Sequence, residues 1–221
     1  KVSQVSVFFR DLEAGPTFGI DEYENFSPAS LLKMPTIFAY FNLKEEDTTL
    51  FEKKLSFTSD KQTATPVFKA PVEIEKNKQY TIKELLRHTA TYSDNIAYST
   101  LYGYLEQIPG GVNMLFTTYQ DLGLADPKDP LQSVLNAHSY SSLFRMLYNI
   151  TYLDPDTSQQ ILSWLEGSTF DMGLAKGVPE GVRVANKFGE RAYEGGEVKQ
   201  LHDCGIVYYP NNPYILCVMT K

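Results

Sequence analysis

Cysteine, histidine and positive charge are scarce in this sequence. Its 221 residues include two cysteines and three histidines, and 20 Lys and Arg residues stand against 27 Asp and Glu residues, giving a net charge of −7. Two cysteines are too few for a disulfide framework. An acidic chain also lacks the clustered positive charge with which proteins hold phosphates. We therefore expect no nucleic-acid partner.

Long apolar runs are missing as well. The chain has no run of about 18 apolar residues, so we expect no membrane span, and its first residues do not have the pattern of a signal peptide. Hydrophobic residues nevertheless make up 43% of the chain, which is ordinary for a globular protein. A chain of this length can bury a sizeable core without staples.

The order of predicted elements indicates an α+β fold. Residues 2–11 are rich in β-branched and aromatic residues and predict the first strand of a hairpin. Residues 30–43 are apolar nearly all round and predict a buried helix. Thr81 and Glu84 form a capping box that begins another helix. Further helices are predicted at 95–107, 111–122, 139–150 and 157–166, and strands at 182–189, 201–210 and 214–220.

Strands at both ends of the chain enclose a helical middle. We therefore expect a mostly antiparallel sheet built from both ends, flanked by helices, with a helical subdomain beside it. Residues 1–28 and 151–221 would form the sheet-containing subdomain and residues 29–150 the helical one, within one compact unit.

One short motif, Ser30-Leu31-Leu32-Lys33, opens the predicted buried helix. A serine hydroxyl is a poor nucleophile until a base removes its proton, and Lys33 lies one helical turn away. The motif alone is weak, because at average composition a Ser-x-x-Lys occurs about once in a chain of this length. By itself it is equally consistent with a helix cap followed by a solvated lysine.

Two further motifs follow in the chain. Ser93-Asp94-Asn95 precedes the helix predicted at 95–107, where its residues are also good N-caps. Lys187-Phe188-Gly189 lies on the first of the late strands and is nearly uninformative alone. The order of the three motifs is informative, because class A β-lactamases and penicillin-binding proteins carry Ser-x-x-Lys, Ser-Asp-Asn and Lys-Thr-Gly in this order.

The sequence resembles this superfamily over residues 5–221. Beyond the motifs, the segments around 85–101 and 158–167, the approach to Lys187 at 177–190 and the final hairpin at 205–221 are similar to its pattern. The resemblance implies a β-lactamase/transpeptidase-like fold and a serine hydrolase that forms an acyl-enzyme. It implies a peptidoglycan peptide or a β-lactam as substrate, no cofactor, no metal, and a secreted or cell-envelope location.

The resemblance also implies roles for individual residues. Ser30 would be the nucleophile and Lys33 its base, with burial and the charge of Lys187 lowering the pKa of Lys33. Ser93 would pass a proton to the leaving nitrogen. Substrate contacts would come from Asn95, Phe188, Gly189 and Glu190, and the amides of Ser30 and Glu190 would form the oxyanion hole.

The sequence departs from the family pattern at two places. The Glu that activates water in class A β-lactamases has Gln132 as its nearest match, and glutamine cannot accept that proton. Phe188 replaces the usual Thr or Ser, whose hydroxyl helps to bind the substrate carboxylate; its ring either lines the pocket or turns into the core. Glu190 would repel an anion, unless Arg191 or Lys199 compensates.

These departures favour a penicillin-binding or D,D-peptidase-like enzyme with slow deacylation. One alternative is a true β-lactamase with a rebuilt loop that uses Asp126 or Asp129 as base. Another is a catalytically weak protein that binds cell-wall fragments or a protein partner. Cys204 and Cys217 would face each other diagonally if the last turn centres on Asn211 and Asn212, which favours core thiols over a disulfide. The three histidines have no metal-ligand spacing and are expected to be structural.

Overall fold

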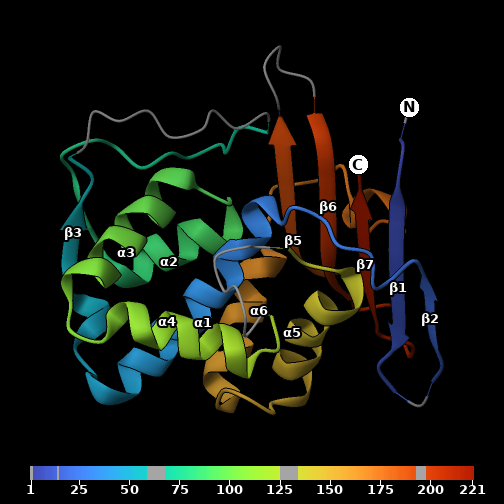
Figure 1. Ribbon diagram of the computed structural model, residues 1–221, viewed down its shortest axis with the longest axis horizontal. Helices are drawn as coiled ribbons and strands as arrows, with labels where there is room; N and C mark the ends of the chain where they lie inside the picture. Colours follow the sequence, from blue (N-terminus) through green and yellow to red (C-terminus); the bar gives the residue numbers. More distant parts are fainter. Residues whose placement is uncertain (1, 14, 59–67, 125–133, 193–197) are drawn as a thin grey trace.

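Figure 1 shows a sheet with helices on one side of it, in a computed structural model that describes residues 2–13, 15–58, 68–124, 134–192 and 198–221. The five strands have the order β2-β1-β7-β6-β5, and every neighbouring pair is antiparallel. The strands are β1 (Val5–Asp11), β2 (Thr17–Ile20), β5 (Val184–Ala192), β6 (Val198–Val207) and β7 (Tyr214–Thr220). The first and last strands of the chain, β1 and β7, are neighbours, which confirms the sheet built from both chain ends.

The helices fill the middle of the chain, as predicted, with shifts of one to three residues at most ends. They are α1 (Lys33–Glu46), α2 (Ile82–Thr91), α3 (Asn95–Gln107), α4 (Gly111–Asp121), α5 (Ala137–Asn149) and α6 (Pro155–Glu166), with the 3-10 turns η1 (Ala29–Leu32), η2 (Leu50–Glu52) and η3 (Leu174–Gly177). A small sheet of β3 (Lys54–Ser56) and β4 (Gln79–Thr81) was not predicted, because strands of three residues are too short to show a period.

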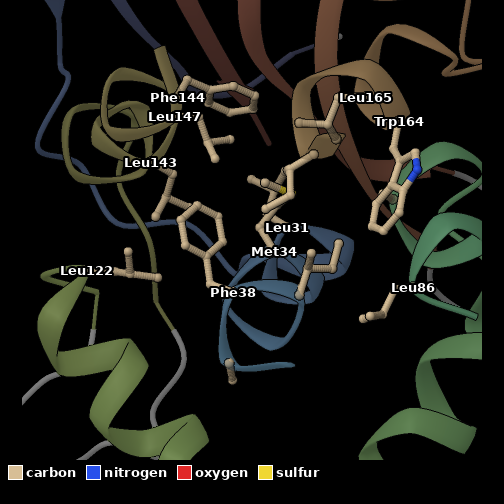
Figure 2. Close-up of a cluster of buried hydrophobic side chains, with 14 of the residues drawn as sticks. Leu31, Met34, Phe38, Leu86, Leu122, Leu143, Phe144, Leu147, Trp164 and Leu165 are labelled. Atoms are coloured by element: carbon tan, nitrogen blue, oxygen red, sulfur yellow. The ribbon is translucent and has the colours of Figure 1, made fainter. Parts of the chain in front are cut away.

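The helix α1 lies at the centre of the molecule. Ten of its fourteen residues are buried, which agrees with the apolar sequence around it. Met34 and Phe38 project into a core shared with Leu86 of α2, Leu143 of α5 and Trp164 of α6 (Figure 2). Since fully burying one such side chain is worth about 1.5–3 kcal/mol, the core fixes α1 firmly in place. Any group at the start of α1 is therefore held on a rigid element.

Local sequence signals set the helix ends. The Thr81 hydroxyl accepts from the Glu84 amide and the Glu84 carboxylate accepts from the Thr81 amide, so the predicted capping box begins α2. Pro35 is the third residue of α1, where a missing N–H costs no helical hydrogen bond. The predicted start at Ser30 corresponds to the 3-10 turn η1, which runs directly into α1.

The expectation of two core thiols is wrong, because Cys204 and Cys217 form a disulfide. Their strands pair with Leu201 opposite Thr220 and Cys204 opposite Cys217. The connection is thus centred on Pro210 and Asn211, one residue earlier than predicted. A shift of one residue in the turn turned a diagonal pair into a directly facing one.

None of the described helices combines the length and apolar character that crossing a bilayer requires.

We predict that the two cysteines are unavailable to thiol reagents even after denaturation without reductant. Reduction should lower the free energy of unfolding by about 2–3 kcal/mol, since the disulfide closes a short loop in the unfolded chain. Thiol titration and urea melts with and without reductant measure both effects. The Cys204→Ala/Cys217→Ala double variant should be indifferent to reductant, and two titratable thiols in unreduced wild type would refute the bridge.

Candidate active site

The Ser30 turn is shaped by the backbone just before it. Ala29 has a left-handed φ of 50°, an uncommon conformation for a residue with a side chain. The two carbonyls that follow Ser30 accept hydrogen bonds from tyrosines, with the buried Tyr140 donating to Leu31 at 3.0 Å and the partly buried Tyr119 donating to Leu32 at 3.2 Å. The serine itself is half-buried at the start of the central helix. The backbone of the turn that carries Ser30 is therefore held in place by these hydrogen bonds.

The amine of Lys33 is buried, with only 3% of the residue exposed. Its Nζ donates to the Ser93 carbonyl, to Ser93 Oγ at 3.2 Å and to Asn95 Oδ1 at 2.6 Å. Burial lowers the pKa of Lys33 to about 7, although the charges of Asp94 and Glu190 act in the opposite direction. The uncharged form of Lys33 is therefore accessible near neutral pH.

The sequence predicts that the Lys33 amine reaches the Ser30 hydroxyl directly. Within the described part of the chain, the amine instead holds Ser93 and Asn95, and no hydrogen bond joins it to the Ser30 hydroxyl. The two residues remain one turn apart at the junction of η1 and α1. Catalytic hydrogen bonds are often long in a protein without substrate and tighten when substrate binds.

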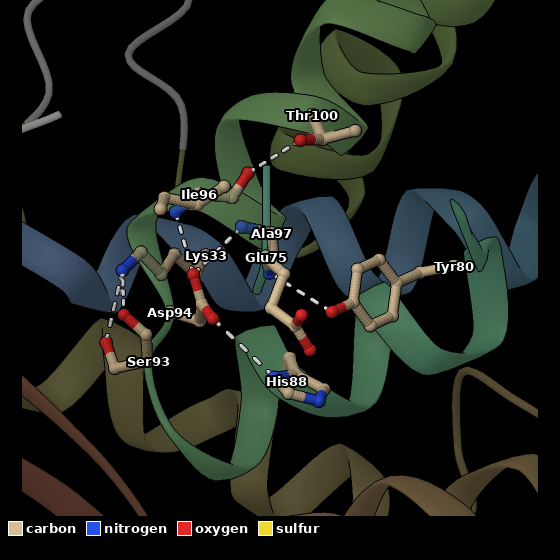
Figure 3. A network of polar contacts seen from close by, with 9 residues as sticks. All are labelled: Lys33, Glu75, Tyr80, His88, Ser93, Asp94, Ile96, Ala97 and Thr100. Atoms are coloured by element: carbon tan, nitrogen blue, oxygen red, sulfur yellow. Dashed lines mark hydrogen bonds and ion pairs between the residues drawn. The ribbon is translucent and has the colours of Figure 1, made fainter. Parts of the chain in front are cut away.

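The turn between α2 and α3 positions Ser93 (Figure 3). Ser93 has a left-handed φ of 55°, and Asp94 caps α3 by accepting from the amides of Ile96 at 2.8 Å and Ala97 at 2.9 Å. The second carboxylate oxygen of Asp94 lies 3.5 Å from Nδ1 of His88. Of the three possible N-caps in the motif, Asp94 is the one that begins α3, and it holds the turn whose Ser93 oxygens accept from Lys33.

Lys187 is completely buried on β5, where its Nζ donates to the Phe188 carbonyl at 2.9 Å. Burial first, and then the charge of Lys33, hold the pKa of Lys187 well below its ordinary value. Like charges lower each other's pKa, so the expected effect of Lys187 on Lys33 has the same sign as the effect of Lys33 on Lys187, and burial is the larger cause at both amines. Burial lowers the pKa of Lys33, and the positive charge of Lys33 in turn disfavours a charge on Lys187.

Gly189 lets β5 approach the serine turn. A Cβ at this position would lie 3.0 Å from the Pro28 carbonyl oxygen and 3.2 Å from the Leu31 nitrogen, closer than ordinary van der Waals contact. From the other side, His202 is fully buried, and its Nδ1 accepts from the Thr220 amide at 3.3 Å. Its Nε2–H therefore donates to the Ser27 carbonyl at 2.9 Å. Two contacts thus hold the sheet against the turn.

The ring of Phe188 takes both positions that the sequence left open. It is only 6% exposed and stacks on Phe170 at 4.2 Å, while Phe68 meets it edge-on at 6.3 Å. These rings line a recess of about 240 Å³. Tyr92, the residue before Ser93 in the sequence, also lines it. The aromatic neighbours were invisible to sequence reasoning, because they come from segments distant from all three motifs.

Glu190 faces both lysines. Its Oε1 accepts from the Phe68 amide at 3.3 Å, and its charge raises the pKa of Lys33 and of Lys187 against the effect of burial. Arg191 donates to Ser27 Oγ at 2.6 Å. Several predicted positions, namely Gln132, Asp126 and Asp129 and the side chain of Lys199, lie outside the described residues.

The histidines serve packing and hydrogen bonding. Besides His202 and His88, His138 packs its ring against Phe8 at 4.9 Å and Tyr23 at 4.8 Å. In the described ranges, no three His, Cys, Asp or Glu side chains gather in a way that could hold a metal ion.

Comparison with known proteins agrees with this geometry. A family model described as the beta-lactamase enzyme family matches residues 1–221. Similar solved structures include PBP-A, at 22% identity with a TM-score of 0.79, over 99% of this chain and 81% of that one. A class A β-lactamase from Mycobacterium abscessus has 20% identity and a TM-score of 0.80, over 99% and 84% of the two chains. None of the curated proteins matches the chain.

We predict that Asp94→Asn lowers the pKa of Lys33 further. The change keeps an oxygen that caps α3 but removes a negative charge that favours the ammonium form of Lys33. A titration of the lysine side chains by NMR, with Lys33→Met to assign the signal, measures the shift. An unchanged or raised pKa would show that Asp94 does not act on Lys33 through its charge.

Proposed function

This chain belongs to the beta-lactamase enzyme family and is accordingly a serine hydrolase, and we propose that Ser30 takes up the acyl group of a β-lactam or of a peptidoglycan-type D-alanyl peptide. The acyl-enzyme would then be hydrolysed slowly. Among the similar structures, a PBP-A mutant is an acyl-enzyme complex with penicillin G, at 21% identity and a TM-score of 0.78. A cell-wall substrate would place the protein in the cell envelope or outside the cell.

The observation that carries this proposal is the surrounding of the Lys33 amine. A neutral amine has two N–H donors and one lone pair. The donors have carbonyl-type acceptors in the Ser93 backbone oxygen and Asn95 Oδ1, so the lone pair is left for a hydroxyl. Ser93 Oγ lies 3.2 Å away, and Ser30 lies on the preceding turn. This arrangement supports Lys33 as a general base.

In the acylation step, Lys33 takes the proton of the Ser30 hydroxyl while Oγ attacks the substrate carbonyl carbon. As the tetrahedral intermediate collapses, the bond from that carbon to the leaving nitrogen breaks. Ser93 gives its proton to the nitrogen and receives the proton held on Lys33, which is neutral again. The substrate contacts would come from Asn95 and β5.

The developing negative charge on the carbonyl oxygen needs donors. β5 is an edge strand, so part of its backbone N–H groups points away from the sheet. We assign this task to the amides of Glu190 and Ser30. Support comes from the close approach of Gly189 to the Ser30 turn, which brings the two amides near one another.

Deacylation requires a water molecule whose oxygen replaces Ser30 on the acyl carbon while its proton passes to a base. The family Glu that serves this purpose in class A β-lactamases has Gln132 only as its nearest match in this sequence, and glutamine cannot accept the proton. Without this base, the acyl-enzyme on Ser30 should be long-lived. A second candidate, a weakly catalytic binding protein, is favoured by Phe188, which stands where the family has a hydroxyl for the substrate carboxylate and stacks on Phe170.

We expect a fluorophosphonate probe to label wild-type protein at one site and to leave Ser30→Ala unlabelled. The variant removes the nucleophile and one small oxygen on a half-buried residue, so its melting temperature should stay within about 2 °C of wild type. Gel fluorescence and peptide mapping provide the readout, with Ser27→Ala as the neighbouring control. Equal labelling of Ser30→Ala at another residue would overturn the assignment.

We also expect a penicillin adduct on Ser30 to persist. Loss of general base catalysis slows water attack by about 10²–10⁴-fold, so the mass increase should survive for many minutes after the free drug is removed. Intact-mass spectrometry over time follows its decay. Rapid return of unmodified protein with release of hydrolysed drug would instead identify a true β-lactamase, and the absence of any adduct would favour the binding protein.

A further inference from the structure

Tyr98, which belongs to none of the three motifs, lies beside the Lys33 amine. It follows Asn95 by three residues on α3, so the two side chains leave the helix on the same face. Lys33 Nζ lies over the Tyr98 ring, 5.8 Å from its centroid, which is within the range of a cation–π contact. The ring therefore completes the surroundings that the oxygens of Ser93 and Asn95 give to the amine.

The oxygens and the ring act differently on the two forms of the amine. An oxygen acceptor takes a hydrogen bond from an ammonium and also from a neutral amine. The face of an aromatic ring carries partial negative charge, so it attracts mainly the ammonium form. Because Lys33 is only 3% exposed, water screens this attraction little. The ring should thus favour the protonated form of Lys33, against the effect of burial.

The position of the Tyr98 ring is set by both helices that it touches. Tyr98 is half-buried, and burial raises the pKa of its phenol, against an interaction with the Thr36 hydroxyl that lowers it. Thr36 is fully buried on α1, one turn after Lys33. The centroid of the Tyr98 ring lies 6.2 Å from that of Tyr102, one turn further along α3. The ring is therefore held next to the amine, and its phenol stays uncharged while Lys33 titrates.

Charged groups on two elements also act on Lys33. Asp94, at the start of α3, and Glu190, on β5, favour its ammonium form. Lys187, also on β5, is a like charge, so each of the two amines disfavours the charge of the other. A substitution of the Tyr98 ring leaves all three of these groups in the chain. Changes at Tyr98 can therefore isolate what the ring contributes.

We propose that Tyr98 is a positioning residue for acyl transfer, which holds the Lys33 amine and stabilises the ammonium that forms when Lys33 takes the proton of Ser30. In this step the O–H bond of Ser30 breaks, an N–H bond forms on Lys33, and Oγ bonds to the substrate carbonyl carbon. The ring favours the charged amine that results over the neutral amine that begins the step. The inference rests on the proposed acyl transfer to Ser30 and adds a group that tunes its base.

The test replaces Tyr98 with phenylalanine and then with phenylalanines that carry one, two and three ring fluorines. Fluorine withdraws negative charge from the ring face and changes the shape of the ring little. The pKa of Lys33 is followed by NMR, with Lys33→Met to assign the signal. It should stay near the wild-type value in Tyr98→Phe and fall stepwise with fluorination, by about 0.4–0.7 of a pH unit in the trifluorinated ring.

Single-turnover acylation of Ser30 by a penicillin provides the second readout. A base with a lower pKa is unprotonated at lower pH, so the midpoint of the acylation profile should move to lower pH together with the pKa of Lys33. A weaker base also accepts a proton less readily. The rate at the alkaline plateau should therefore fall by about two-fold in the trifluorinated variant.

Tyr102→Leu is the matched control, because it removes an equal ring one turn further along the same helix. It should leave the pKa of Lys33 and the acylation profile as in wild type. Tyr98→Leu should lower the pKa as the trifluorinated ring does, and should lower the plateau rate further because the amine also loses a packing partner. The fluorinated series keeps the shape of the ring, so it decides the question even if Tyr98→Leu does not fold.

The outcomes separate this inference from the function on which it rests. A pKa of Lys33 that is constant or rises across the fluorinated series, or that falls equally in Tyr102→Leu, would overturn the action of the ring while leaving acyl transfer intact. A falling pKa with an unchanged acylation profile would overturn the positioning role. No acyl mass on Ser30 of wild type would refute the proposed function itself, while the NMR titration would still show whether the ring acts on the amine.

Discussion

The structure depends on accommodating one group that is costly to bury, the amine of Lys33. A buried ammonium without partners would cost several kcal/mol, and the chain meets this cost in two ways. It supplies two carbonyl-type oxygens, from Ser93 and Asn95, and it lets the amine lose its proton near neutral pH. The same arrangement that makes the burial tolerable leaves a lone pair available, so stability and the proposed chemistry have one origin.

Three segments, far apart in the sequence, meet around that amine and the Ser30 turn. The apolar α1 fixes Lys33 and the preceding serine turn in the core, the α2–α3 turn carries Ser93, and the edge strand β5 closes on the turn at Gly189. Each segment has a locally strained or crowded backbone: Ala29 and Ser93 adopt left-handed φ angles, and Gly189 approaches the Ser30 turn closely. Because β5 belongs to a sheet that joins both chain ends, the site is complete only when the whole chain has folded.

Much of this was predictable from sequence, because helices with apolar faces and capped ends, and strands with alternating patterns, carry local signals. The Ser30, Ser93 and Lys187 motifs were found by their order along the chain. The disulfide was missed, since its pairing depends on a turn register that shifts with one residue, and the stacking of Phe170 on Phe188 was missed because it joins distant segments. How far burial lowers the pKa of Lys33 and of Lys187 depends on the packing around each amine, which the sequence does not specify.

The most direct test of Lys33 as the base is the pH dependence of Ser30 acylation in a single turnover, measured from about pH 5 to about pH 9. A base must be unprotonated to act, and the pKa of Lys33 is lowered to about 7. The acylation rate should therefore rise about ten-fold per pH unit in the acid range and level off above neutrality, with its midpoint near 7. A rate that is independent of pH, or one that still rises steeply at the alkaline end as an ordinary lysine requires, would contradict the account.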